Sequence, residues 1–195
     1  MRVRRRPREG GQGLMEFALV APILLVLVFG VFDFGRGMSA NVTVANSSRE
    51  GARYMAASSS TSTAAAPNYW GFGDCPGALV NGVPTSPTAG GTLKAWRQLQ
   101  ADNLTLTNVQ FIASFYDTDP NGDSNHTNAK MTLTCPADQS STVPTISTTG
   151  NYTPATTDWV IFEIKYSYKP STPLISAFVH NGVVSLDQLT TMVLD

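Results

Sequence analysis

Few residues of this chain are of a type and spacing that could do chemistry. Among its 195 residues are 14 acidic residues, 2 histidines and 2 cysteines. It contains no G-x-S-x-G, H-E-x-x-H or P-loop motif, and neither His126 nor His180 has an evident nucleophile partner. We therefore expect a protein that is not an enzyme. A glutamate in an apolar run, a cysteine pair and an acidic loop remain as candidate sites.

The glutamate is Glu16, the third residue of an otherwise apolar run from Leu14 to Phe32 (LMEFALVAPILLVLVFGVF). As a helix these 19 residues span roughly 28 Å, close to the thickness of a bilayer core. A carboxylate in hydrocarbon costs about 3 kcal/mol on insertion scales, so Glu16 should have a partner or a function. Pro22 removes one hydrogen bond from the same helix and favours a bend.

The charge distribution predicts how this helix crosses the membrane. Five of the 13 basic residues precede it, namely Arg2, Arg4, Arg5, Arg6 and Arg8. This asymmetry places the N-terminus in the cytoplasm and the C-terminal domain outside. A cleaved secretory signal is the alternative, although its apolar region is normally only about 7 to 15 residues long. The net charge of -1 and the low charged fraction of 14% argue against a nucleic-acid partner.

The N-terminal segment also resembles a known family. From Arg4 to Phe17 (RRRPREGGQGLMEF) it is similar to the leader of a class III prepilin, in which a glutamate stands five positions after a glycine. Residues 11–37 and the segment NSSREGARY (46–54) resemble the TadE/TadG-like family, the minor pilins or pseudopilins of the Tad (Flp) type IV pilus. The remainder matches only loosely, and the final MVLD departs from the Met-Arg-x-Glu ending common in that family.

The resemblance implies cleavage by a prepilin peptidase between Gly11 and Gln12, which makes Glu16 the fifth mature residue. A cut after Gly13 is the competing position. The resemblance also assigns assembly to Glu16, Phe17 and Pro22, with the new amine of one subunit pairing with the glutamate of a neighbour. The implied partners are other pilin subunits, the peptidase and the Tad inner-membrane assembly platform. The implied location is the inner membrane, followed by the pilus or cell surface.

We expect the helix to continue beyond the membrane, because Gly35, Gly37 and Gly51 weaken a helix but do not break it as proline would. The predicted organisation is a leader at 1–11, a pilin helix at 12–57, a linker at 58–67 and a head at 68–195, giving a lollipop shape. An apolar stripe is predicted to lie on the head: Phe34, Met38, Val42, Ala45, Ala52 and Ala56.

The head is predicted to be α+β, with a mainly antiparallel sheet. Ten of the 12 prolines lie at or beyond Pro67, which excludes a long helical bundle there. Thr92 is expected to cap a short helix over 93–100, whose Leu93, Trp96 and Leu99 share a core face. Enrichment in β-branched and aromatic residues predicts strands at 108–116, 130–135, 158–168 and 183–193.

Two further sites are predicted in the head. Cys75 and Cys135, both outside the membrane, are expected to form a disulfide that closes a loop of about 60 residues and contributes roughly 4 kcal/mol. A two-cysteine zinc site is the alternative, but the histidines have no suitable spacing. The loop starting at Asp117 (DTDPNGD) matches the first seven positions of a calcium loop, so weak calcium binding is one hypothesis. A solvated turn rich in Asp, Asn and Gly needs no metal and is the favoured interpretation. Its oxygen ligands would be Asp117, Asp119, Asn121 and Asp123.

These features favour a pilin-like structural subunit of a Tad pilus that supports pilus assembly or adhesion. A membrane-anchored extracellular binding or adhesin domain also explains the span and the cysteines, but it leaves Glu16 and the glycine before it without a role. The major pilin of an unusual filament is a further alternative.

Overall fold

The computed structural model describes residues 11–58, 69–80, 83–104, 106–120, 128–172, 176 and 179–195. Its chain divides into two compact units. One unit comprises the first 38 residues together with residues 169–183, and the other comprises residues 39–168 together with 184–195. The predicted leader, except Gly11, and the predicted linker, except Ser58, lie outside the described residues.

The longest element is the N-terminal helix α1, which runs from Gln12 to Ser58. Its 47 residues include Pro22, and the helix continues through that position. The predicted long helix is therefore confirmed, and its end at Ser58 lies one residue beyond the predicted end.

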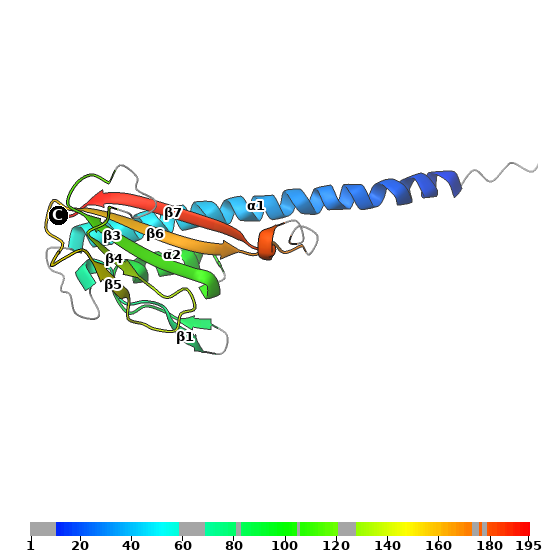
Figure 1. The fold of residues 1–195 in the computed structure, drawn as a ribbon. Coiled ribbons are helices and arrows are strands. Elements are labelled where there is room, and N and C mark those ends of the chain that lie inside the picture. The colour runs from blue at the N-terminus through cyan, green and yellow to red at the C-terminus, as the bar shows by residue number, and fades with distance from the viewer. Residues whose placement is uncertain are drawn as a thin grey trace, which may run out of the picture. The chain divides into compact units, whose positions relative to one another are not determined.

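A five-stranded antiparallel sheet lies in the second unit (Figure 1). Its spatial order is β5-β4-β3-β6-β7. The two longest strands, β6 and β7, pair over their full length from Trp159 opposite Val193 to Tyr168 opposite Val184. The bounds are β3 Val109–Tyr116, β4 Met131–Thr134, β5 Thr145–Thr148, β6 Trp159–Tyr168 and β7 Val184–Val193. The α+β class and the four predicted strands are confirmed, each strand to within one residue at either end.

Three strands were not predicted from the sequence. β5 is four residues long, and its sequence TIST lacks the apolar alternation that identifies a strand; each of its residues is exposed. β1 (Gly77–Val80) and β2 (Val83–Thr85) form a separate antiparallel hairpin whose register shifts after Gly77. The described residues also include the short 3-10 helices η3 (Tyr69–Gly71), η4 (Leu106–Asn108) and η5 (His180–Gly182).

The head helix α2 runs from Gly90 to Ala101, so the prediction that Thr92 caps it is wrong. Its N-cap position is Ala89, and the carboxylate of Asp74 accepts hydrogen bonds from the Thr88 and Ala89 amides at 2.7 and 3.0 Å. The Thr92 hydroxyl instead donates to the Asp74 carbonyl at 2.7 Å, inside the packed structure. The predicted core positions Trp96 and Leu99 are buried.

The face of α1 that packs in the second unit matches the predicted apolar stripe only in part. Ala52 is buried and Ala45 and Ala56 are half-buried, whereas Val42 is 56% exposed. Phe34 and Met38 belong to the first unit, where they are 70% and 50% exposed. Buried positions within residues 39–58 are mostly small or polar: Ala40, Thr43, Val44, Ser47, Ser48, Gly51, Ala52 and Met55. Small side chains let a helix pack closely against a sheet. Close packing therefore explains why small residues, rather than the large apolar residues of the predicted stripe, occupy the buried face.

At Gly51 the backbone of α1 lies very close to a side chain of the sheet. A Cβ atom built there would lie 2.4 Å from Cε1 of Phe162, well inside van der Waals contact. Phe162 is fully buried, and the Phe72 and Phe111 rings lie 6.0 and 6.1 Å from its centroid. Because these neighbours leave the ring little room to move, position 51 requires glycine.

We expect Gly51→Ala to lower the free energy of unfolding by about 1 to 3 kcal/mol through overpacking, despite the better helix propensity of alanine. Gly35→Ala is the matched control on the same helix, since a Cβ there meets nothing within 4 Å. Thermal melts of the full chain in detergent, followed by near-UV circular dichroism, would measure both. Equal melting temperatures for the two variants would contradict the close packing.

Candidate functional site in the N-terminal helix

The predicted cleavage position lies at the start of α1. Gly11 is the first described residue and Gln12 is the first residue of the helix. The Gln12 side chain donates a hydrogen bond of 3.4 Å from Nε2 to Oε1 of Glu16, one helical turn away. The backbone nitrogen that cleavage would free therefore belongs to a residue that already lies beside Glu16.

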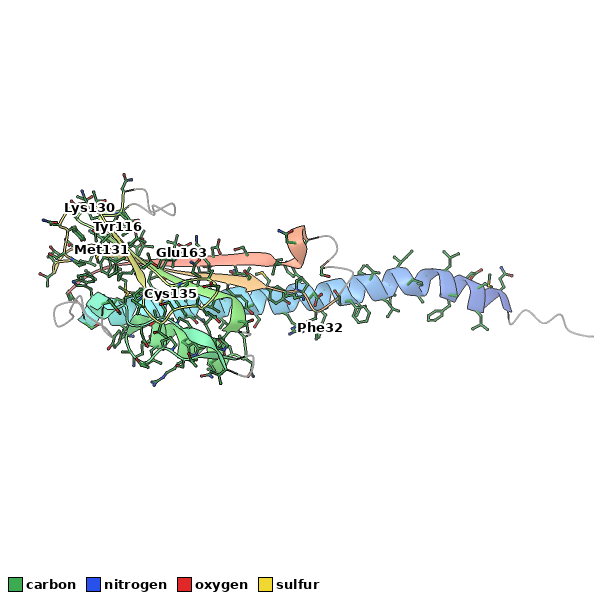
Figure 2. All side chains as sticks on the ribbon, turned by 60° about the horizontal axis from the view of Figure 1, so that its bottom comes forward. Phe32, Tyr116, Lys130, Met131, Cys135 and Glu163 are labelled. Carbon is green, nitrogen blue, oxygen red and sulfur yellow. A yellow bond between two sulfur atoms is a disulfide. The ribbon has the colours of Figure 1, made fainter. Side chains whose placement is uncertain are left out.

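The N-terminal half of α1 presents an exposed apolar surface. Large side chains from Leu14 to Phe32 are 47% to 74% exposed, including Phe17 at 71%. Figure 2 shows Phe32 among side chains that stand out from this part of the helix. By length and composition α1 could cross a membrane, and its most apolar window is not buried. A surface this apolar is unfavourable in water and indicates contact with lipid or with other helices.

Glu16, Phe17 and Pro22 share this exposed part of the helix without forming a pocket or cluster. Glu16 and Pro22 are exposed like their apolar neighbours. The three predicted assembly residues can therefore contact other molecules. Their assembly role stays a prediction.

Asp33 is an exception within this exposed helix, because it is only 4% exposed. Its carboxylate accepts hydrogen bonds from the backbone amides of Ser171 and Thr172, at 3.3 and 3.1 Å, and from the Thr172 hydroxyl. The Arg36 guanidinium donates to the Ser171 hydroxyl. We call Ser171 and Thr172, which follow β6, the strap.

These hydrogen bonds stabilise the ionised form of Asp33. The Thr172 hydroxyl has the largest effect, and together with the two strap amides and Arg36 it holds the pKa of the Asp33 carboxyl below its ordinary value, although burial acts in the opposite direction. Asp33 therefore stays charged at neutral pH while its oxygens are occupied. The sequence shows Asp33 as the first charge after the apolar run, but the strap is more than 130 residues away and no spacing points to it.

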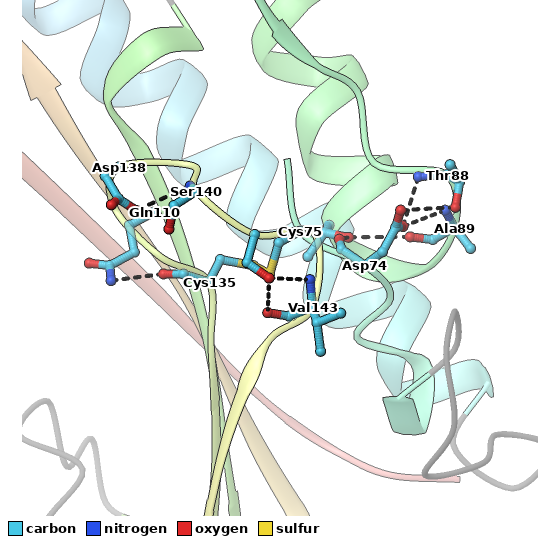
Figure 3. The surroundings of a disulfide bond; sticks show 11 residues. Asp74, Cys75, Thr88, Ala89, Gln110, Cys135, Asp138, Ser140 and Val143 are labelled. Atoms are coloured by element: carbon cyan, nitrogen blue, oxygen red, sulfur yellow. Dashed lines mark hydrogen bonds between the residues drawn. A yellow bond between two sulfur atoms is a disulfide. The ribbon is translucent and has the colours of Figure 1, made fainter. Parts of the chain in front are cut away.

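The predicted disulfide between Cys75 and Cys135 is present in the second unit, and both residues are fully buried (Figure 3). It connects the segment before β1 with the end of β4. The Cys75 amide donates to the Thr142 carbonyl at 2.8 Å, and the Cys135 amide donates to the Phe111 carbonyl at 2.9 Å. The disulfide therefore joins two segments, each of which is also held in place by a backbone hydrogen bond.

The calcium hypothesis concerns the loop after β3 and stays a prediction. Asn121 and Asp123 lie outside the described residues. Of the two remaining proposed ligands, Asp117 forms a salt bridge of 3.3 Å with Lys130. Lys130 would therefore compete with a cation for that carboxylate.

One comparison with known proteins gives a match. Residues 11–53 match the family model of the TadE-like proteins. The matched segment is α1 without its last turn, and it includes the predicted cleavage position, Glu16 and Asp33. No curated protein and no solved structure matches the chain. The resemblance of the N-terminal segment to this family is thus confirmed, and it indicates a protein associated with the Tad pilus and with a membrane.

The buried disulfide should contribute a large share of the stability of the second unit. Replacing Cys75 and Cys135 together by serine should lower the free energy of unfolding by roughly 4 kcal/mol on the chain-entropy model. Reductant should destabilise the wild-type chain strongly and leave the double variant unchanged. Denaturant titrations of both proteins would test this, and sensitivity of the wild-type chain to a chelator instead would support the zinc alternative.

Proposed function

We propose that this chain is a pilin-like structural subunit of a Tad pilus, a minor pilin or pseudopilin rather than an enzyme. The observation that carries the proposal is the TadE-like match at residues 11–53, over a helix whose large apolar side chains are exposed. In a soluble domain on its own, this helix would expose large apolar side chains to water, which is unfavourable. It suits a subunit that is first held in the inner membrane and then packs against the helices of other pilin subunits.

Processing is the first step of the proposed function. A prepilin peptidase removes residues 1–11, and the new amine of Gln12 begins the mature helix. The contact between Gln12 and Glu16 supports this reading, because the new ammonium would arise one turn from a carboxylate. In hydrocarbon each charge is costly alone, and pairing neutralises both. The same ammonium can instead pair with the Glu16 of a neighbouring subunit during assembly.

The proposed topology has the N-terminus in the cytoplasm and the second unit outside. The arginines before the helix support this orientation, and the buried disulfide suits an oxidising compartment. The proposed partners are other pilin subunits, the peptidase and the Tad inner-membrane assembly platform. The mature subunit would then reach the pilus or the cell surface, where its second unit supports assembly or adhesion.

Coexpression with the cognate prepilin peptidase should shorten the chain to an N-terminus at Gln12. Intact mass and Edman sequencing would identify the cut. Gly11→Val should block processing, whereas Gly13→Val should leave it unchanged. The opposite pattern would place the cut after Gly13, and a chain that stays full length in the presence of active peptidase would exclude a prepilin.

Glu16 should support assembly rather than folding. Glu16→Gln should reduce incorporation into sheared pili by about tenfold or more, because it leaves the ammonium of the partner subunit unpaired, and an unpaired charge in hydrocarbon costs about 3 kcal/mol. Glu50→Gln is the matched control, because Glu50 is also exposed on α1. Quantitative immunoblots of pilus and membrane fractions would measure both variants. Equal incorporation of the two would show that Glu16 has no partner in the filament.

A further inference from the structure

The burial of Asp33 changes the charge pattern on the surface of α1. Between Glu16 and Arg36, Asp33 is the single charged residue of the helix. It is 4% exposed, whereas Phe32 and Phe34 on either side are 65% and 70% exposed. The exposed surface from Phe17 to Gly35 therefore presents no charged side chain. The apolar surface is longer than the apolar run in the sequence.

Asp33 can be buried as an ionised carboxylate because the strap supplies hydrogen-bond donors to it. An ionised carboxylate has about four acceptor sites, and the strap supplies three donors from Ser171 and Thr172. Charge-assisted hydrogen bonds of this kind replace those that water would otherwise make. Without these donors a carboxylate at position 33 would need solvent and would hold the adjacent helix surface at the water boundary.

Arg36 limits the extent of this surface. Its guanidinium reaches back to the Ser171 hydroxyl, so its charge lies at the strap. Long cationic side chains commonly keep their charge in the interfacial region while the aliphatic part contacts apolar surroundings. Gly35, with open space around its Cβ position, places no side chain between Phe34 and Arg36.

We propose that the strap, by satisfying Asp33, lets the bilayer cover α1 beyond the end of its apolar run, so that lipid contacts Phe34. The occupant is lipid because the Phe34 surface continues the apolar surface of residues 14–32 without an exposed charge. The inference rests on the proposed membrane anchor. It assigns Asp33 and Thr172 the role of positioning residues that set where the embedded surface ends.

A fluorescent reporter at position 34 would test the proposal on the full chain in nanodiscs. The two native cysteines are joined in the disulfide, so Phe34→Cys supplies a single thiol for an environment-sensitive dye. We expect a quencher attached to lipid tails near the headgroups to quench this dye. Val42→Cys is the matched control, because Val42 is also exposed on the helix but lies about 12 Å further along it. Its dye should escape quenching.

Removing the strap donors tests whether the hydration of Asp33, rather than the hydrophobicity of the helix surface alone, decides whether lipid contacts position 34. Thr172→Pro deletes both the amide and the hydroxyl donor, so the Phe34 label should lose most of its quenching as the carboxylate returns to water. Adding Asp33→Ala to this variant removes the group that needs water and should restore quenching. This rescue would also show that Thr172→Pro had not simply disrupted the fold.

Three results would overturn the inference. The label at position 34 could escape quenching in the unmodified background, or Asp33→Ala could fail to rescue Thr172→Pro. Quenching that falls as protein is concentrated in the nanodiscs would identify a neighbouring helix, rather than lipid, as the occupant. Each of these outcomes leaves the anchor intact, whereas a chain that fails to insert into nanodiscs at all would overturn the anchor and this inference together.

Discussion

The close contact between α1 and the sheet at Gly51 is the constraint on which the second unit depends. The helix can lie against Phe162 because position 51 has no side chain. Gly91 at the start of α2 reflects the same crowding, since a Cβ there would lie 2.8 Å from the Gly51 carbonyl oxygen. Both helices and the interior strand β6 therefore meet around two glycines. Buried hydroxyl groups nearby are satisfied by hydrogen bonds of 2.8 Å, one between the Ser48 and Thr190 hydroxyls and one from the Ser47 hydroxyl to the Thr43 carbonyl.

The two parts of α1 have different surroundings: one is packed within the second unit, and the other exposes large apolar side chains. From Ser39 onward the helix is part of a packed unit, and its buried face uses small and hydroxyl side chains to come close to the sheet. Before that point its large apolar side chains are exposed, which is stable only against lipid or other helices. The family match spans both parts, so the characteristic feature of this family model is the helix itself rather than the sheet.

The sequence predicted those elements whose local pattern and tertiary environment agree. β3 and β6 are central, and their runs of aromatic and β-branched residues could be recognised directly. β5 is an exposed edge strand with the sequence TIST, so its pairing with β4 rather than its own pattern makes it a strand. The buried face of α1 was predicted only in part: the alanines of the predicted stripe were expected there, but Ser47, Ser48 and Gly51 were not, because the prediction followed apolar side chains whereas close packing selects small ones. The partner of Asp33 arises from a contact between distant segments, which no local spacing encodes.

Asp33 and Glu16 show two ways of placing a carboxylate on an apolar helix. Asp33 is satisfied within the chain, because two strap residues supply its donors and bury it. Glu16 is exposed, and the hydrogen bond described for it is a long one of 3.4 Å from Gln12 on the preceding turn. A buried carboxylate whose oxygens already accept hydrogen bonds has few acceptor sites left for another molecule. An exposed carboxylate on an apolar surface is stabilised more strongly by pairing with a cation. The same helix therefore carries one carboxylate that is held within its own structure and one that is exposed, and under the proposed function the second would lie beside the amine that leader cleavage creates.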